Sequence, residues 1–156
     1  YEKYAEMVKP LAVFSATWKG IPLMYSGQEL PNLKRLLFFD KDVIEWSETA
    51  QLHEFYKTLF RLRKTHPAFK CMMNAQTFVQ IRNSVDHHVL SFKRLSANHC
   101  CCVMINFSPY DLSLVEFEGD LPHGEYAEVF SNERRHIDTK YQYVDLKEWD
   151  FKIWIN

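Results

Sequence analysis

The residues best placed to do chemistry are Gln28 and Glu29, which follow directly on a short apolar run at residues 20–25. An amide and a carboxylate at the end of a buried strand can hydrogen-bond a polar ligand, such as the hydroxyl groups of a sugar. Asp40 and Asp42 form a second close pair of acids, two positions apart in a segment of alternating charge. Such a segment is more often a solvated loop than a site. For Glu29 we weigh two roles, a carboxylate that ties neighbouring loops together, which we favour, and direct contact with a ligand.

Other kinds of site find little support in the sequence. Three of the four cysteines are consecutive, Cys100 to Cys102, and neighbouring residues of a strand point to opposite faces. They cannot form one corner of a tetrahedral metal site, so we expect small core residues kept as thiols. Cysteines kept as thiols favour a reducing compartment, but they do not identify the compartment. The histidines are scattered apart from His87-His88, and the four glycines form no phosphate-binding motif. No metal and no cofactor is predicted for this chain.

The apolar run that leads to Gln28 predicts a strand. Residues 21–25 are too few for an ordinary helix and do not alternate with polar residues, which indicates a parallel strand buried on both faces. Pro22 suits the first position of such a strand, where a missing N–H costs least. Active sites of parallel-strand folds form at the carboxyl ends of the strands. Gln28 and Glu29 are therefore candidate substrate-binding residues.

Helical patterns flank this strand on both sides. The first runs from about Glu2 to Trp18, where Pro10 marks a kink or a start and Gly20 suits the left-handed position beyond a helix end. The second begins after Ser47, a candidate N-cap, and ends before Pro67. The residues between the strand and the second helix have no clean period, so we expect a long loop.

The second half of the chain changes to the two-residue period of β-strands. Short segments rich in Val, Phe, Tyr and Ile are separated by turn residues, which predicts an antiparallel sandwich or Greek key. The predicted strands are residues 76–82, 88–94, 100–107, 112–117, 125–131, 141–146 and 150–155. We predict two domains, residues 1–72 and 73–156. The fold class is therefore α+β: two helices and one short strand of an α/β barrel unit, followed by an antiparallel β-sandwich.

Composition limits the classes of function. The chain has 156 residues, of which 47% are hydrophobic, and 19 basic against 20 acidic residues give a net charge of −1. This balance gives no field that would attract nucleic acid or an anionic membrane, and no apolar run is long enough to span a bilayer. The chain begins with Tyr1 rather than Met, so we expect a fragment or a processed product.

Several motifs in a fixed order resemble the α-amylase family, glycoside hydrolase family 13. Gly-Ile-Pro-Leu-Met-Tyr-Ser-Gly-Gln-Glu at residues 20–29 is similar to the eighth strand of that family's catalytic TIM-type (β/α)8 barrel. Arg-Leu-Arg-Lys at residues 61–64 and His-Pro-Ala-Phe at residues 66–69 are similar to the end of its eighth helix. Asn-Phe-Ser at residues 106–108 and Glu-Tyr-Ala-Glu-Val-Phe at residues 125–130 resemble its C-terminal β-domain more weakly. The chain thus resembles the C-terminal part of an α-amylase-like enzyme.

The resemblance implies a parent enzyme that cleaves α-1,4-glucosidic bonds with retention. Such enzymes use two carboxyl groups about 5–5.5 Å apart, to which the family adds a third, stabilising aspartate. All three come from the fourth, fifth and seventh strands, upstream of the part that this chain resembles, so we expect no catalytic residue and no hydrolysis by the chain alone. Tyr25, Phe38 and Trp46 could stack on a sugar ring, although aromatic residues beside a barrel more often belong to its core. Some family members bind calcium through residues that lie mostly outside this stretch.

Two other functions stay open. The second half could be a glucan-binding module, which predicts a row of exposed aromatic residues. The candidates are Tyr110, Tyr126, Tyr141, Tyr143, Trp149 and Trp154. The chain could also be an α+β scaffold that binds another protein. If it is a fragment, its one barrel strand lacks neighbours, so we expect an exposed apolar surface in the first half. The expected partners are an α-glucan, the upstream barrel and a second copy of the chain, with no nucleic acid and no membrane.

Overall fold

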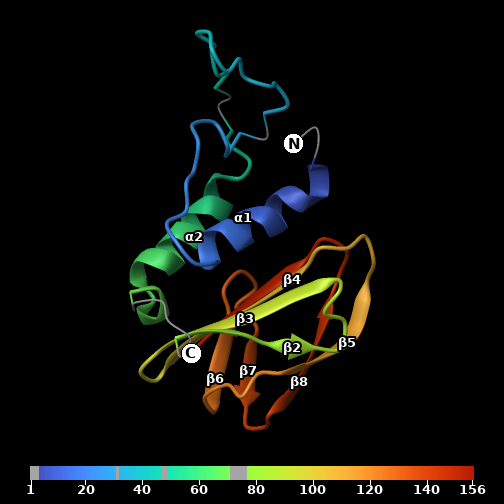
Figure 1. The fold of residues 1–156 in the computed structure, drawn as a ribbon. Helices are drawn as coiled ribbons and strands as arrows, with labels where there is room; N and C mark the ends of the chain where they lie inside the picture. Colours follow the sequence, from blue (N-terminus) through green and yellow to red (C-terminus); the bar gives the residue numbers. More distant parts are fainter. Residues whose placement is uncertain (1–3, 31, 47–48, 71–76) are drawn as a thin grey trace.

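The computed structural model describes residues 4–30, 32–46, 49–70 and 77–156. They form three layers, with two helices on top, a six-stranded antiparallel sheet beneath them and a three-stranded antiparallel sheet on the far side (Figure 1). The predicted α+β class and the β-sandwich in the second half are confirmed. Over these described ranges, no helix has the length and hydrophobicity needed to cross a membrane.

The first predicted helix is present with shorter bounds. α1 covers Val8–Thr17 and follows a 3-10 turn, η1, at Ala5–Met7. Pro10 is the third residue of α1, so the helix starts close to the proline as expected. Gly20, beyond its end, has the positive φ of +92° that was predicted.

The second helix begins later than predicted and ends where expected. α2 covers His53–Thr65, and its N-cap is Leu52, which offers no capping side chain. The predicted N-cap Ser47 lies outside the described residues. His66 takes an extended ψ of 130°, as a residue before proline should, and the 3-10 turn η2 follows at Pro67–Phe69.

The strand predicted at residues 21–25 is not formed. This segment belongs to neither sheet, although its side chains alternate as in a strand. Ile21, Leu23 and Tyr25 are 95%, 80% and 64% exposed, and the residues between them are partly buried. A strand depends on hydrogen bonds to neighbours on its edges, and neither sheet that the structure describes pairs with this segment. No strand is therefore formed at residues 21–25 in this chain by itself, and its identity as a buried barrel strand stays a prediction, whereas the expected exposed apolar surface is confirmed.

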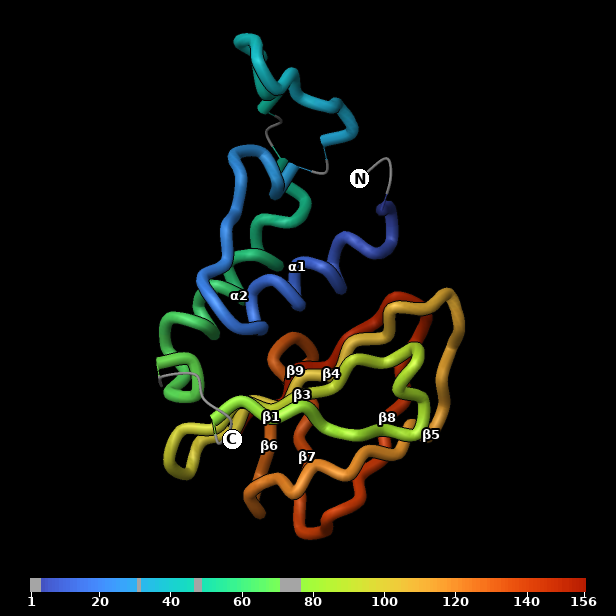
Figure 2. The backbone as a smooth tube through the Cα atoms, viewed as in Figure 1, coloured from blue at the N-terminus to red at the C-terminus, as the bar shows by residue number. Residues whose placement is uncertain are grey.

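The loop after this segment adds to the exposed apolar surface. Residues 32–46 project away from both helices and both sheets (Figure 2). Phe38 and Trp46 are 90% and 63% exposed, and the rings of Phe38 and Phe39 meet edge to face at 4.8 Å. Tyr25, Phe38 and Trp46 belong to neither described core, and whether they pack in a barrel core or stack on a sugar ring stays a prediction.

The strands confirm six of the predicted segments to within a few residues. The bounds are β1 Phe78–Gln80, β2 Arg82–Asn83, β3 Val89–Ser96, β4 His99–Asn106, β5 Leu112–Glu118, β6 Gly124–Glu128, β7 Arg134–Ile137, β8 Tyr141–Leu146 and β9 Phe151–Ile155. The six-stranded sheet has the order β1-β3-β4-β9-β6-β7, and the three-stranded sheet has the order β2-β5-β8. The strand predicted at residues 76–82 splits at Ile81, where the chain passes between the sheets. The prediction missed β7, which has only one apolar residue.

Two hydrophobic cores hold the three layers together. One lies between the helices and the six-stranded sheet and includes Leu59, and the other lies between the sheets and includes Phe117. Cys101 packs into the first core, whereas the cysteine on either side of it packs into the second. All three are buried free thiols, so the expected alternation is confirmed. The predicted boundary at residues 72–73 lies outside the described residues, and the division into two domains stays a prediction.

Two arginines, Arg94, which is buried, and Arg63, which is partly buried, fasten the C-terminal end of α1 to the rest of the fold. Arg94 of β3 is 1% exposed, and its guanidinium donates to the carbonyl oxygens of Thr17 and Trp18, both at 3.0 Å, and of Ala68 at 3.2 Å. Arg63 of α2 donates to two further carbonyls near the same end of α1. The last carbonyls of a helix lack intrahelical partners and carry partial negative charge, so cationic donors stabilise this end.

Candidate functional site

The predicted site residues lie in a turn at residues 25–30 that requires glycine. Backbone hydrogen bonds of 3.0 and 3.1 Å close the turn. Gly27 has φ +81°, and a Cβ atom built there would meet Cγ2 of Ile44 at 2.8 Å. The carbonyl oxygen of Glu29 accepts a hydrogen bond of 3.0 Å from the N–H of Leu52, the N-cap of α2. The turn is thereby fixed to the start of α2.

Gln28 uses both ends of its amide inside the protein. Its Oε1 accepts from the backbone N–H of Tyr25 at 3.1 Å, and its Nε2 donates to the hydroxyl of Tyr56 at 2.9 Å. Tyr56 belongs to α2 and is buried. Gln28 also lines a hollow of about 220 Å³ beside α1. Through these two hydrogen bonds, Gln28 connects the turn to α2. Contact between Gln28 and a substrate stays a prediction.

Glu29 presents a buried oxygen that is unpaired within the described part of the chain. The side chain is partly buried, and no donor from the described residues reaches its Oε2 atom. A buried acceptor left without a donor costs about 1–3 kcal/mol. A donor from a further part of the protein or from a ligand hydroxyl would remove this cost. Both roles considered for Glu29, loop brace and ligand contact, remain predictions.

The acidic pair in the loop serves the loop itself. Asp42 accepts hydrogen bonds from Nζ of Lys34 at 2.5 Å and from the backbone N–H groups of Leu37 and Val43 at 3.0 and 2.8 Å. The lysine, followed by these backbone donors, lowers the pKa of Asp42 to about 2. An ionised carboxylate that holds its own loop fits the solvated-loop interpretation of Asp40 and Asp42.

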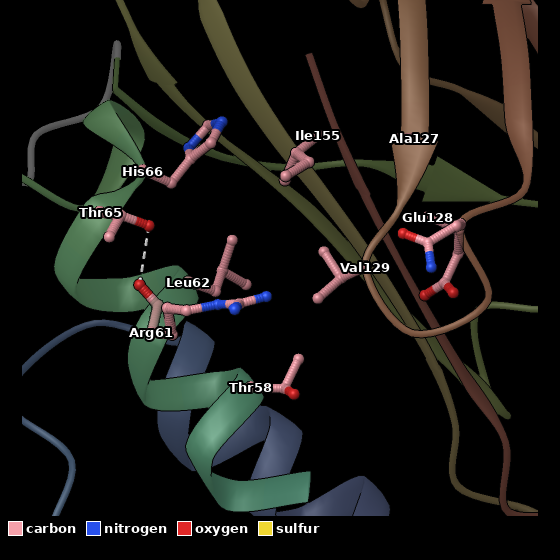
Figure 3. A pocket seen from close by; sticks show the side chains of 10 residues that line it. Thr58, Arg61, Leu62, Thr65, His66, Ala127, Glu128, Val129 and Ile155 are labelled. Atoms are coloured by element: carbon pink, nitrogen blue, oxygen red, sulfur yellow. Dashed lines mark hydrogen bonds between the residues drawn. The ribbon is translucent and has the colours of Figure 1, made fainter. Parts of the chain in front are cut away.

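A pocket that the sequence analysis missed lies between α2 and the segment after β6 (Figure 3). Its volume is about 210 Å³. Arg61 extends from α2 toward Val129 across it (Figure 3). The residues that line it are Thr58, Arg61, Leu62, Thr65, His66, Ala127, Glu128, Val129, Asn132 and Ile155.

Glu128 is the buried acid of this pocket, at 2% exposure. Its Oε2 accepts from the N–H of Phe130 at 2.9 Å and from the N–H and hydroxyl of Ser131 at 2.6 and 2.9 Å. Its Oε1 accepts from the N–H of Ile153 at 3.1 Å. The carboxylate therefore holds the turn after β6 against β9. The sequence did carry a signal for this buried acid. Glu128 lies two positions after Tyr126 and so on the same, inward side of the predicted strand, where a carboxylate needs hydrogen-bond donors.

His66 is the buried base of the same pocket. Its Nε2 lies 3.3 Å from the carbonyl oxygen of Asn156, and its Nδ1 accepts from the N–H of Ala68 at 3.4 Å. Burial lowers the pKa of His66, and nearby His99 lowers it further. A neutral imidazole and a carboxylate that is saturated with backbone donors both hold the chain together, so we assign this pocket no catalytic role.

The six aromatic residues proposed as a sugar-binding row differ in exposure, and Trp149 is partly buried. Tyr126 and Trp154 are each 1% exposed and belong to the core between the sheets. Their proposed place in an exposed row was therefore wrong. Tyr110, Tyr141 and Tyr143 are 58%, 49% and 50% exposed, and the last two lie on the same strand, β8.

The histidine pair lies in a turn rather than on a strand. The ring centroids of His87 and His88 are 4.2 Å apart, so these neighbours do not point to opposite faces as they would on a strand. Within the described residues, no group of three or more His, Cys, Asp or Glu side chains is arranged to hold a metal ion.

Comparison with known proteins identifies the fold. No model of a protein family matches the sequence, and no curated protein matches it. A maltogenic α-amylase, AmyB from Thermotoga neapolitana, superposes with a TM-score of 0.77 at 19% identity, over 97% of this chain and 36% of that chain. An Anoxybacillus α-amylase gives 0.71 at 19% identity, over 97% and 32%. AmyP in complex with maltose gives 0.69 at 14% identity, over 98% and 35%.

These matches confirm, at the level of the fold, the resemblance to the C-terminal part of an α-amylase-like enzyme. The chain spans about a third of the length of the amylases that it matches, with nearly all of its own residues included. TM-scores of 0.69–0.77 establish a shared fold, and identities of 14–19% limit the likeness to the fold. The helices and both sheets of this chain therefore have counterparts in amylases.

Proposed function

We propose that the chain is the C-terminal part of an α-amylase-like retaining glycoside hydrolase that acts on α-1,4-linked glucans. The observation that carries this proposal is the asymmetry of the match, in which 97% of this chain superposes on 36% of an amylase. The remaining two thirds of such an enzyme would supply the other barrel strands. The motifs at residues 20–29 and 61–69 independently favour the same alignment.

The extended segment at residues 21–25 supports this proposal. Its side chains already alternate between inside and outside, as in a barrel strand, and Ile21 and Leu23 are almost bare. An apolar, extended segment with unpaired edges is a poor surface for a complete protein. Neighbouring barrel strands would pair its backbone and cover its side chains in one step.

We further propose that the chain alone hydrolyses nothing. A retaining glycosidase needs two carboxyl groups about 5–5.5 Å apart. In the first half of the chain, Asp42 is held by Lys34 at 2.5 Å, and Glu54 on α2 is held by Lys57 at 2.9 Å. Glu29 lies on the separate turn at residues 25–30. The reacting carboxylates would come from the upstream part of the barrel.

For Gln28 and Glu29 we propose supporting roles at the mouth of that barrel. Gln28 positions the turn through Tyr25 and Tyr56, and Oε2 of Glu29 accepts a donor from a barrel loop in preference to a sugar hydroxyl. In the chain extended upstream, Glu29→Gln should lower the melting temperature and leave KM unchanged. A raised KM with unchanged melting temperature would instead assign the residue to substrate binding.

The proposed function is tested by adding the upstream sequence. The reading frame extended before Tyr1 should yield a chain that releases short sugars from maltoheptaose, while residues 1–156 alone should match a buffer blank. Turnover by residues 1–156, or none by a folded extended chain, would overturn the proposal. Light scattering of residues 1–156 tests the related prediction that the bare segment drives self-association, with the double variant Ile21→Ser, Leu23→Ser as the control.

A second candidate is a glucan-binding module without catalysis in the parent. The specific observation in its favour is that Tyr141 and Tyr143 are both half exposed on one strand of the β-sandwich. An extended chain that binds maltoheptaose but does not cleave it would favour this candidate over the hydrolase.

A further inference from the structure

The outer face of the three-stranded sheet carries an ordered row of aromatic and polar side chains. In β5 and β8 the side chains alternate, so Val115, Phe117 and Val144 point into the core between the sheets. The intervening residues Tyr141 and Tyr143 lie on the opposite face, which no described element covers. This face is therefore free of any packing role in the sandwich core.

The strand register places these side chains in two parallel rows. Arg82 of β2 pairs with Glu118 of β5, which pairs with Tyr141 of β8. In the next outward-facing row, Glu116 of β5 pairs with Tyr143 of β8. A hollow of about 190 Å³ lies over these rows. It is lined by Arg82, Asn83, Ser84, Glu116, Glu118 and Tyr141.

The ring of Tyr143 is held in position before any ligand arrives, and Tyr141 lies beside it on the same strand. Their positions on one strand differ by two residues, which sets their Cα atoms roughly 7 Å apart. The hydroxyl of Tyr143 donates to Oε2 of Glu116 at 2.8 Å, and the backbone carbonyl of Tyr143 accepts from Arg135 at 2.8 Å. A tyrosine fixed through its hydroxyl offers a rigid apolar ring face at little cost in conformational entropy.

The charges of this face do not favour a highly charged ligand. The carboxylates of Glu116 and Glu118 are balanced by Arg82 and Lys140, and Lys140 forms an ion pair with Glu118. Because charges of both signs alternate on this face, it has no concentration of one sign that would attract a polyanion such as nucleic acid or a polycation. It does offer both donors and acceptors beside apolar rings, which suits a neutral ligand with many hydroxyl groups.

We infer that the outer face of β2-β5-β8 is a carbohydrate-binding surface, on which Tyr141 and Tyr143 stack against successive sugar units while Arg82, Glu116 and Glu118 bond their hydroxyls. The chemical class of ligand follows from this face alone. The choice of an α-1,4-linked glucan among neutral oligosaccharides rests on the proposed function. This surface would add to the proposed function by letting the β-sandwich bind the glucan chain on which the enzyme acts.

Titration of residues 1–156 with maltoheptaose tests the inference. We expect weak but saturable binding by calorimetry, with NMR shift changes confined to β2, β5 and β8. The double variant Tyr141→Ala, Tyr143→Ala should weaken binding about tenfold or more, because it removes both stacking faces. Tyr110→Ala is the matched control, since Tyr110 is equally exposed but lies away from this sheet face, and its affinity should equal that of the parent chain.

Further variants separate the ligand contacts from folding defects. Tyr143→Phe keeps the stacking ring and loses the bond to Glu116 that fixes it, so it should weaken binding much less than the double alanine variant does. No binding by the parent chain, or equal binding by the double alanine variant with an unchanged fold, would overturn the inference. An extended chain that is inactive on maltoheptaose would overturn the proposed function alone, because binding at this face is measured without turnover.

Discussion

Replacing Arg94 should destabilise the fold more than any surface change, because this side chain joins three separate segments. Its guanidinium is 1% exposed and donates to the carbonyls of Thr17, Trp18 and Ala68 at 3.0–3.2 Å. It also lies 4.2 Å from the ring centroid of Phe69. Arg94→Met keeps much of the stem and removes every donor, so three carbonyls lose their charged partner.

The expected size follows from these contacts. Hydrogen bonds from a charged donor contribute about 1.5–3 kcal/mol each, and removing a buried charge recovers part of its desolvation cost. We therefore expect Arg94→Met to lower the free energy of unfolding by about 3–5 kcal/mol, which for a chain of this size lowers the melting temperature by roughly 6–20 °C. Arg94→Lys retains the charge but not the fork of donors, and its loss should be about half as large.

Urea unfolding followed by circular dichroism measures this loss. Arg134→Met on β7 is the matched control, because Arg134 is exposed, and it should change stability by no more than about 0.5 kcal/mol. Hydrogen exchange should show the loss of protection concentrated at the end of α1. An Arg94→Met chain as stable as the Arg134→Met chain would refute the view that Arg94 joins α1 to the sheet.

Three further predictions follow from other contacts. A double-mutant cycle of Gln28→Ala and Tyr56→Phe should give a coupling of about 0.5–1.5 kcal/mol, and additive effects would deny the 2.9 Å bond between them. Burial lowers the pKa of His66 from its usual 6.5, so the unfolded chain binds the proton more tightly and stability is lost as the pH falls below about 6.5. His66→Gln should flatten that pH dependence below about pH 6.5, and parallel unfolding curves would contradict the assignment. Burial raises the pKa of Cys100 to about 11 and also raises the pKa of Cys101 and Cys102. In a Cys71→Ser background, alkylation of these thiols at pH 8 should therefore require unfolding of the chain. Rapid labelling of the native chain would contradict the structure.

The sequence predicted the elements whose signals are local. Pro67 ends α2, Gly20 takes a positive φ beyond α1, and the alternation in β9 gives its bounds almost correctly. Each of these outcomes depends on residues within a few positions of one another. The same holds for the alternation of the three consecutive cysteines between two cores.

The failures depend on pairing partners that the local pattern of residues does not show. Residues 21–25 have the composition of a strand but no neighbour in either sheet. β7 has a polar sequence and is a strand because β6 pairs with it. Arg94 and Thr17 are 77 positions apart, so no local pattern could reveal their contact. For the candidate site, the sequence located the turn at Gln28 and Glu29 but not the hydrogen bonds that fix it.

The extended segment at residues 21–25 offers the most direct test of the central claim. Hydrogen exchange at the backbone amides of Leu23 and Met24 should be compared between residues 1–156 alone and the chain extended upstream. If the segment is a barrel strand that lacks its neighbours, these amides should exchange rapidly in the short chain and become strongly protected in the extended chain. Equal exchange in the two chains, with both folded, would show that the upstream sequence supplies no such neighbours.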